Sequence, residues 1–201
     1  MCPQAKKERL SPELAQRLAA LYRRMEDAYD LVARQLDFSC RDCPSNCCDS
    51  YFLHHTRIEW AYLRQGLEQL SPEHQGLIRE RALAWREREA EALAENRHPE
   101  AMCPLNEEGL CVLYQHRLMI CRLHGVPSSI TLPNGRSQKF PGCFRCQELT
   151  ADRAAAPAVE RASLLRELVM LEQLMPSGPT PPGVSRVKIR KSIAEMILEE
   201  L

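Results

Sequence analysis

Residues 40–48 read Cys-Arg-Asp-Cys-Pro-Ser-Asn-Cys-Cys and place four thiols within nine positions. Packing does not account for this stretch, because a cysteine in a core behaves as a small hydrophobe and gains nothing from clustering. Five of the ten cysteines follow in the middle of the chain, as Cys103, Cys111, Cys121, Cys143 and Cys146. Cys2 alone lies apart. The pattern predicts a central region that is built around sulfur and binds metal.

The composition favours a reduced, cytoplasmic protein. A chain of 201 residues fits one domain, with or without an appendage, and its cysteine density is about half that of a disulfide scaffold. The first ten residues are charged and lack the apolar run of a signal peptide, and no window approaches the ~20 apolar residues that span a bilayer. In the cytosol thiols stay reduced and bind metal, although disulfides remain the alternative for an even number of cysteines.

The charge is balanced overall but uneven along the chain. The 27 basic and 27 acidic residues cancel, whereas a protein that binds nucleic acid usually has a basic surplus, so no such partner is expected. Residues 109–147 contain no acid but five cations, which are Arg117, Arg122, Arg136, Lys139 and Arg145. Four thiolates around a divalent ion carry a net charge of about −2, which nearby cations stabilise. We favour this charge compensation over a chance distribution, and an anion-binding patch for a substrate stays open as a third interpretation.

Most of the remaining sequence predicts helices. Residues 11–13 and 71–73 both read Ser-Pro-Glu, which supplies an N-cap, a proline in the first turn and an early acid. We expect these helices to end near Leu36 and Asn96. Thr56 and Glu59 have the spacing of a capping box, which predicts a third helix from Arg57. In the second half we expect a short helix over 112–123, a β-hairpin over 130–136 with Asn134-Gly135 at its turn, a helix over 158–175 with Thr150 as its cap, and an amphipathic helix over 189–201.

The predicted fold class is mainly α, a helical domain with a loop-rich cysteine lobe and one small β-hairpin. Three regions are expected: an N-terminal helix over 1–36, a cysteine-cluster domain over 37–148, and C-terminal helices over 149–201 with a proline-rich linker at 176–183. The apolar stripe of the last helix must dock on its own chain or on a partner. A protein partner or a homodimer formed through that helix is therefore one expectation.

The cysteine spacing indicates how the metal is held. Cys40/Cys43 and Cys143/Cys146 are C-x2-C pairs, which chelate one ion because the intervening turn brings both sulfurs to one side. Two such pairs could complete one tetrahedral site. The side chains of the adjacent Cys47 and Cys48 diverge, so these residues are expected to serve two sites, or one of them bridges two metals. The candidate ligands are Cys40, Cys43, Cys47, Cys48, Cys103, Cys111, Cys121, Cys143 and Cys146. Nine thiols suit two four-ligand sites or one polynuclear cluster.

The cofactor is expected to be an iron–sulfur cluster or zinc, since both accept an all-thiolate shell. The spacing matches neither ferredoxin pattern, but adjacent cysteines in a basic lobe favour iron–sulfur. The histidines His54, His55 and His124 lie near cysteines in the sequence, and we expect core or surface roles for them because nine thiols need no further ligand. No nucleophile elbow, P-loop or zinc-protease motif is present. The sequence therefore leaves enzymatic activity open while favouring a role without it, and no catalytic residue is predicted.

The order of motifs over about residues 36–148 is more specific than the cysteines alone. It comprises Cys40, Cys43, Cys47 and Cys48, then Tyr51-Phe52 and Glu59, then Cys103-Pro104-Leu105, Gly109-Leu110-Cys111, Tyr114, Arg117 and Cys121-Arg122. This order resembles the CxxCxxCC family, the zinc- or iron-chelating domain of YkgJ-type cysteine-cluster proteins. Two departures are an extra residue before the Cys47-Cys48 pair and Leu118 where the family has proline. The resemblance implies metal binding without an agreed reaction, with Cys143 or Cys146 as the eighth cysteine.

These observations predict a metal-binding protein that acts as a redox, metal-handling or assembly module. One alternative is a cluster-dependent enzyme, because flagellin lysine N-methylases look similar in their cysteine pattern. Another is a structural zinc module that recruits a partner through the C-terminal helix.

Overall fold

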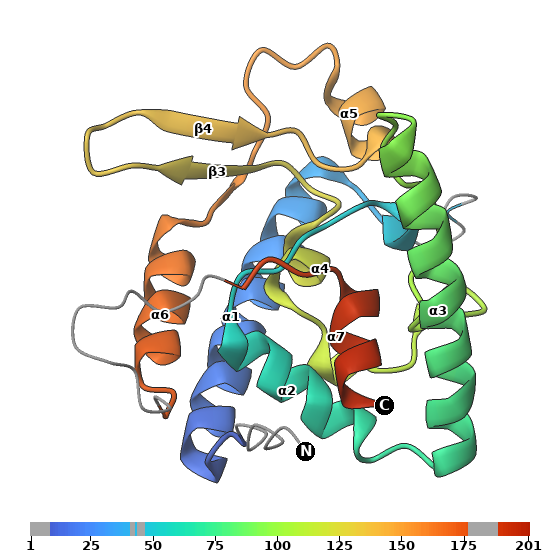
Figure 1. Ribbon diagram of the computed structural model, residues 1–201. Helices are drawn as coiled ribbons and strands as arrows, with labels where there is room; N and C mark the ends of the chain where they lie inside the picture. The colour runs from blue at the N-terminus through green and yellow to red at the C-terminus, as the bar shows by residue number, and fades with distance from the viewer. Residues whose placement is uncertain (1–8, 41–42, 44–46, 177–188) are drawn as a thin grey trace.

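The computed structural model describes residues 9–40, 43, 47–176 and 189–201. Its fold is mainly α, as predicted. The α-helices are α1 (Pro12–Leu36), α2 (Arg57–Leu67), α3 (Pro72–Ala94), α4 (Met119–Leu123), α5 (Phe144–Thr150), α6 (Ala162–Gln173) and α7 (Ile193–Glu200). Short 3-10 turns are η1 (Cys47–Asp49) and η2 (Tyr114–His116), and the strands are β1 (Asn106–Glu107), β2 (Leu110–Cys111), β3 (Ser128–Thr131), β4 (Ser137–Phe140) and β5 (Val159–Glu160). Figure 1 shows their arrangement.

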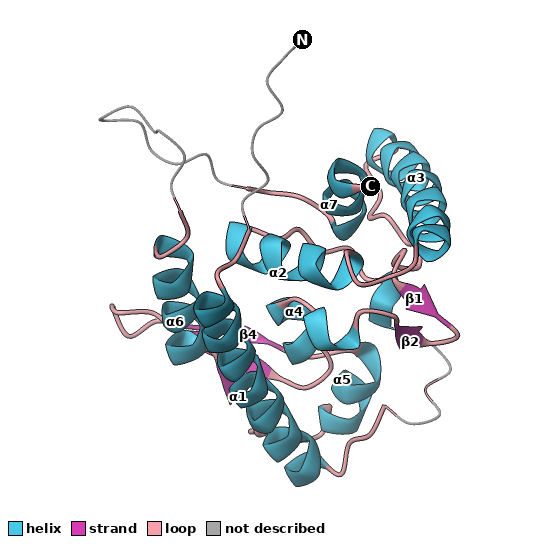
Figure 2. Cartoon of the chain, turned by 90° about the horizontal axis from the view of Figure 1, so that it is seen from below, coloured by secondary structure: helices cyan, strands magenta, loops and turns pink. Residues whose placement is uncertain are grey.

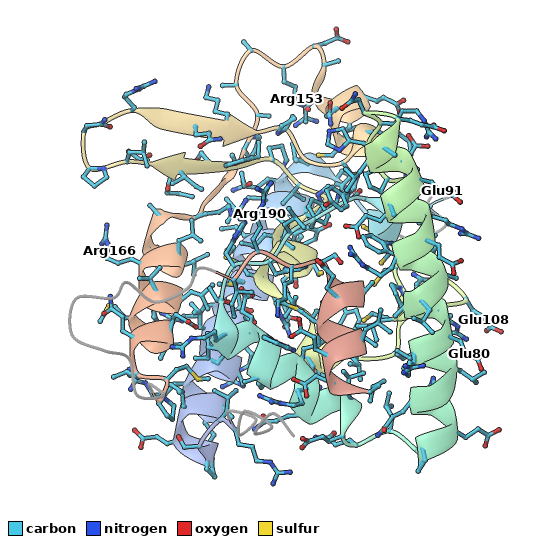
Figure 3. The ribbon with its side chains drawn as sticks, viewed as in Figure 1. Glu80, Glu91, Glu108, Arg153, Arg166 and Arg190 are labelled. Atoms are coloured by element: carbon cyan, nitrogen blue, oxygen red, sulfur yellow. The ribbon has the colours of Figure 1, made fainter. Side chains whose placement is uncertain are left out.

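The two Ser-Pro-Glu signals start helices as predicted. The Ser11 side chain accepts a hydrogen bond from the Leu14 N–H at 3.2 Å, and the Ser71 side chain accepts one from the His74 N–H at the same distance. Helix α1 ends where Asp37 adopts a left-handed conformation with φ of 52°. Helix α3 ends at Ala94, slightly before the predicted end. Figure 3 shows Glu80 and Glu91 of α3 pointing away from the molecule, so this face is solvated.

Two hydrophobic cores hold the helices together. In the first, α1 packs against α4 and α6. In the second, α7 packs along α3 and contacts α2, and the two views in Figures 1 and 2 both show α7 beside α3. The cores draw on all three regions of the chain that the sequence outlined. Within the described residues, no helix is long and apolar enough to cross a membrane.

The sheets are small but more numerous than predicted. Strands β3 and β4 form the expected antiparallel hairpin, with Gly135 at φ of 79° in the loop between them. Strand β5 adds to β3 in parallel, with Val159 opposite Ser128. A second, two-stranded ribbon of β1 and β2 occupies the turn between Cys103 and Cys111. The prediction of a single ribbon was therefore incomplete.

Helix α2 begins at Arg57 with Thr56 as its N-cap residue, as predicted, but the predicted capping box and the predicted Thr150 cap are wrong. Thr56 precedes α2 but makes no side-chain cap bond; its hydroxyl donates to the Glu59 carboxylate at 2.7 Å. Glu172 of α6 accepts the Ile58 N–H at 2.8 Å and so serves the start of α2 from outside the helix. Thr150 ends α5 rather than opening a helix, and its hydroxyl donates to the Cys146 carbonyl at 2.8 Å.

Three predicted helices are shorter than expected. The helix predicted over 112–123 is divided into η2 and α4, because Arg117 and Leu118 have extended backbone between them. The helix predicted over 158–175 begins at Ala162, since the preceding residues pair with β3 as strand β5. The last helix begins at Ile193, after a capping box formed by Ser192 and Glu195. Apart from Pro176, the predicted linker at 176–183 lies outside the described residues.

The apolar stripe of the last helix docks on its own chain, one of the two expected places. Ala194, Met196 and Ile197 are at most 1% exposed and belong to the second core. The chain before the helix also pairs with the main body: the His54 N–H donates to the Lys191 carbonyl at 2.7 Å, and the Lys191 N–H donates back at 3.1 Å. The C-terminal segment is thus an integral part of the fold.

Candidate metal centre

One group of thiols, which we term the inner set, consists of Cys48, Cys103, Cys111 and Cys121. They come from four separate segments, η1, the loop before β1, strand β2 and helix α4. The Cys103 N–H donates to the Cys48 carbonyl at 2.9 Å and joins two of these segments. The thiols of Cys48, Cys111 and Cys121 are close enough to that of Cys103 to act on its pKa. Folding therefore gathers four thiols that are up to 73 positions apart (121 minus 48).

Burial is the main influence on the inner set. It raises the pKa of the Cys103, Cys111 and Cys121 thiols, that of Cys121 to about 12, and the neighbouring thiols of the set add to the effect. At neutral pH such thiols are protonated unless a positive charge compensates the thiolates. A bound metal cation supplies that charge, and thiolate ligands release their protons when it binds. The donor chemistry of the inner set fits zinc or an iron–sulfur cluster.

The second group, the outer set, consists of Cys40, Cys43, Cys143 and Cys146. It contains both C-x2-C pairs, Cys40/Cys43 and Cys143/Cys146. The sequence predicted that these two pairs could form one site. The Cys43 N–H donates to the Cys40 carbonyl at 3.3 Å, while Cys143 is the N-cap of α5. Burial, together with the neighbouring Cys143 and Cys40 thiols, raises the pKa of Cys146 to about 11. Both Cys143 and Cys146 thus lie in the outer set.

Cations accompany both sets. Arg145 lies within the second C-x2-C pair, and the pKa of its guanidinium is raised by a hydrogen bond to Cys43 and by the nearby Cys43, Cys143 and Cys40. Arg117 and Arg122 both lower the pKa of Cys111, opposing the effect of burial. The other two cations of the acid-free window, Arg136 and Lys139, are exposed on the hairpin. Charge compensation at the thiols thus involves three of the five predicted cations.

The two sets line one cavity of about 770 Å³, to which every thiol named above except Cys146 contributes. The eight cysteines of the two sets carry thiols rather than disulfide bonds. No three His, Cys, Asp or Glu side chains within the described ranges are placed so that they could hold a metal ion. In each set the thiols therefore lie near one another but do not form a complete coordination shell. The side chain of the ninth candidate, Cys47, is not among those that the structure describes.

The nearby histidines lie in apolar surroundings. His54 is 4% exposed and therefore a core residue, and burial together with the neighbouring His55 lowers its pKa to about 4. Burial also lowers the pKa of His124, whose ring packs edge-on against Phe52 with centroids 5.0 Å apart. Both residues border the cavity. Their uncharged rings extend its apolar lining at neutral pH.

The buried His54 predicts a loss of stability in mild acid. Its ordinary pKa of 6.5 falls to about 4 on folding, so between these values the unfolded chain binds the proton and the native chain does not. Stability is therefore full above pH 6.5 and declines towards pH 4, by up to about 3 kcal/mol. Urea unfolding of the wild type and of His54→Gln at pH 7.5 and 4.5 should show a smaller decline for the variant. The same substitution at the exposed His98 is the control, and an equal decline in all three proteins would contradict the assignment.

A buried acid that the sequence did not single out as functional positions helix α4. Glu59 is 4% exposed, and one of its carboxylate oxygens accepts the Met119 N–H at 2.6 Å and the Tyr22 hydroxyl at 3.1 Å. Met119 is the first residue of α4, the helix that carries Cys121. Burial raises the pKa of Glu59, and the bonds it accepts oppose that rise. Its place in the apparent capping box concealed this role in the sequence.

Replacement of Glu59 by Gln should destabilise the protein by about 1–3 kcal/mol, because an amide cannot accept from all three donors that the carboxylate serves. The control is Glu68→Gln, whose carboxylate is exposed and lies 3.7 Å from Arg9. That change should stay within about 0.5 kcal/mol of the wild type. Chemical unfolding of both variants at pH 7 measures the difference. Equal stabilities would mean that the Glu59 bonds do not hold α4.

The arrangement matches no characterised protein in the comparisons made: no family model, no curated protein and no solved structure is significantly similar to this chain. The case for its function therefore depends on its own residues.

Proposed function

We propose that this protein binds metal through two four-thiolate sites, one formed by the inner set and one by the outer set. The observation that carries the proposal is the division of eight thiols into two groups of four, which is the number of ligands in a tetrahedral zinc site or around an iron–sulfur cluster. Binding would draw each group together into a coordination shell. Zinc and iron–sulfur clusters are both compatible with these donors.

The role that we propose is a redox, metal-handling or assembly module. Thiols line the cavity together with the cations Arg117, Arg122 and Arg145. The resemblance to YkgJ-type cysteine-cluster proteins supports metal binding and implies no particular reaction. An iron–sulfur cluster would supply one-electron chemistry, whereas zinc would confer stability or serve as cargo.

The test is anaerobic purification of the full chain, followed by measurement of iron, zinc and acid-labile sulfide and by a visible spectrum. Iron and sulfide in similar amounts, with an absorption that bleaches on reduction, would support the redox role. Zinc alone in a colourless protein would support the structural or cargo role. A reduced, folded protein that binds neither metal after anaerobic reconstitution would overturn the proposal.

The shared cavity favours a second candidate, a cluster-dependent enzyme. Its volume of about 770 Å³ lies in the range of small-molecule sites, and both thiol sets border it. A methyl transfer like that of the flagellin lysine N-methylases is one such reaction. Calorimetric titration of the metal-loaded protein with S-adenosylmethionine distinguishes the candidates: saturable binding supports the enzyme, and its absence argues against a methyl transfer that uses this donor.

A further inference from the structure

We propose that the two sites have different tasks: the inner site retains its ion as part of the folded core, and the outer site exchanges its ion with an acceptor that offers thiolates. The inference rests on the proposed function and adds to it which site handles metal. Its basis is the difference in how the two sets are embedded in the fold.

Three of the four inner thiols pack against the second hydrophobic core. Cys103, Cys111 and Cys121 all pack against the buried side chains of that core. Cys121 lies on α4, which is at the middle of the molecule in both Figure 1 and Figure 2 and whose start is bonded to Glu59. An inner thiolate can leave its ion only if packed core residues move with it. Close packing makes such movement costly, so exchange at the inner site should be slow.

The outer set has two ligands at a hydrophobic core and two outside it. Cys146 is 0% exposed and belongs to the first core, against which the partly buried Cys143 also packs, whereas Cys40 is exposed and Cys43 is partly buried. Helix α5, which Cys143 caps, lies at the margin of the molecule in both views. Cys40 lies in a segment outside any helix or strand. The Cys40 and Cys43 thiolates can therefore leave an ion without disturbing a core, while Cys143 and Cys146 keep the site in place.

Arg145 adds a reason for anionic acceptors, of which thiolates are one kind. Its guanidinium bonds to Cys43 and lies near Cys40 and Cys143, and the residue is partly exposed. A cation at the entrance of a site raises the local concentration of anions and speeds their arrival. In the exchange, each bond from the metal to a cysteine sulfur breaks as a bond to an acceptor sulfur forms. No electron is transferred, and each released cysteine thiolate takes up a proton from the solvent.

The experiment measures how fast each ion leaves. The full chain, reconstituted anaerobically with zinc alone, is mixed with excess EDTA, and the zinc that stays bound is measured over time after desalting. We expect two phases of equal amplitude whose rates differ by at least about tenfold, which corresponds to about 1.4 kcal/mol in activation free energy. Cys40→Ser, a change at an exposed position, should remove the fast phase and leave the slow one unchanged.

A second pair of variants tests the role of the entrance cation. Arg145→Gln should slow the fast phase for anionic EDTA by at least about threefold, whereas Arg136→Gln, which removes an exposed cation on the hairpin, should leave it unchanged. Two bound ions that leave at one rate, or loss of the slow phase in Cys40→Ser, would overturn the inference and leave the proposed function standing. A protein that never acquires zinc or iron would overturn both.

Discussion

Cys121→Ser and Cys146→Ser should each retain about half of the metal bound by the unsubstituted protein, since one four-ligand site is lost and the other kept. Cys121 belongs to the inner set and Cys146 to the outer set, and the two thiols pack in different hydrophobic cores. A serine hydroxyl occupies almost the same space as a thiol, but it is a poor ligand at neutral pH. The loss should therefore come from coordination rather than from packing.

Double variants sharpen this prediction. Cys103→Ser combined with Cys121→Ser removes two ligands from one set and should still retain about half of the metal. Cys121→Ser combined with Cys146→Ser removes one ligand from each set and should retain almost none. Elemental analysis of the desalted proteins gives the ratios, and circular dichroism shows whether each variant is folded. Cys2→Ser, which lies outside both sets, is the control.

The pattern of losses distinguishes two sites from one shared cluster. If every single variant lost all of its metal while remaining folded, one polynuclear centre would replace the two sites. Cys47 provides an independent comparison. The sequence predicts that it is a ligand, and its side chain is not among those that the structure describes. A lower metal content in Cys47→Ser would support that prediction, and a full content would exclude Cys47 as a required ligand.

Local signals in the sequence predicted a large part of the fold. The two Ser-Pro-Glu starts succeeded because an N-cap serine and a proline act within one helical turn and need no distant partner. The hairpin of β3 and β4 was predicted because its Asn134-Gly135 turn signal is also local. The prediction that Thr150 caps a following helix was wrong because its hydroxyl donates to a carbonyl of the preceding turn. The sequence around a single threonine does not show which of these bonds it makes.

Distant contacts limited the prediction of the site. Spacing indicated that the two C-x2-C pairs could share an ion, because each pair forms within one turn. The meeting of Cys48 with Cys103, Cys111 and Cys121 depends on how α2, α3 and α4 pack, which no local spacing encodes. The role of Glu59 in holding α4 could not be predicted from the sequence for a similar reason. Its spacing from Thr56 is that of a capping box, but its carboxylate serves Met119, sixty positions away.

Deletion of residues 177–201 should unfold the protein or leave it only partly folded at 37 °C, although the segment contains no cysteine. It removes Met196 and Ile197, which are completely buried against α2 and α3. Truncating one such side chain to Ala costs about 2–5 kcal/mol, and whole domains have stabilities of only about 5–15 kcal/mol. The deletion also removes Glu200, whose carboxylate lies 3.3 Å from the Arg64 guanidinium in a buried ion pair.

Metal binding should be lost together with the fold. Ile193 and Ala194 border the cavity that both thiol sets line, so their removal opens a wall beside the candidate sites. Thermal unfolding followed by circular dichroism, together with elemental analysis, measures both effects. Met196→Ala is a milder change that should cost about 2–5 kcal/mol, and Met170→Ala, at a position that is 55% exposed on α6, is its matched control. A truncated protein with a wild-type melting temperature and full metal content would show that α7 is dispensable, and the second core would then have to be stable without it.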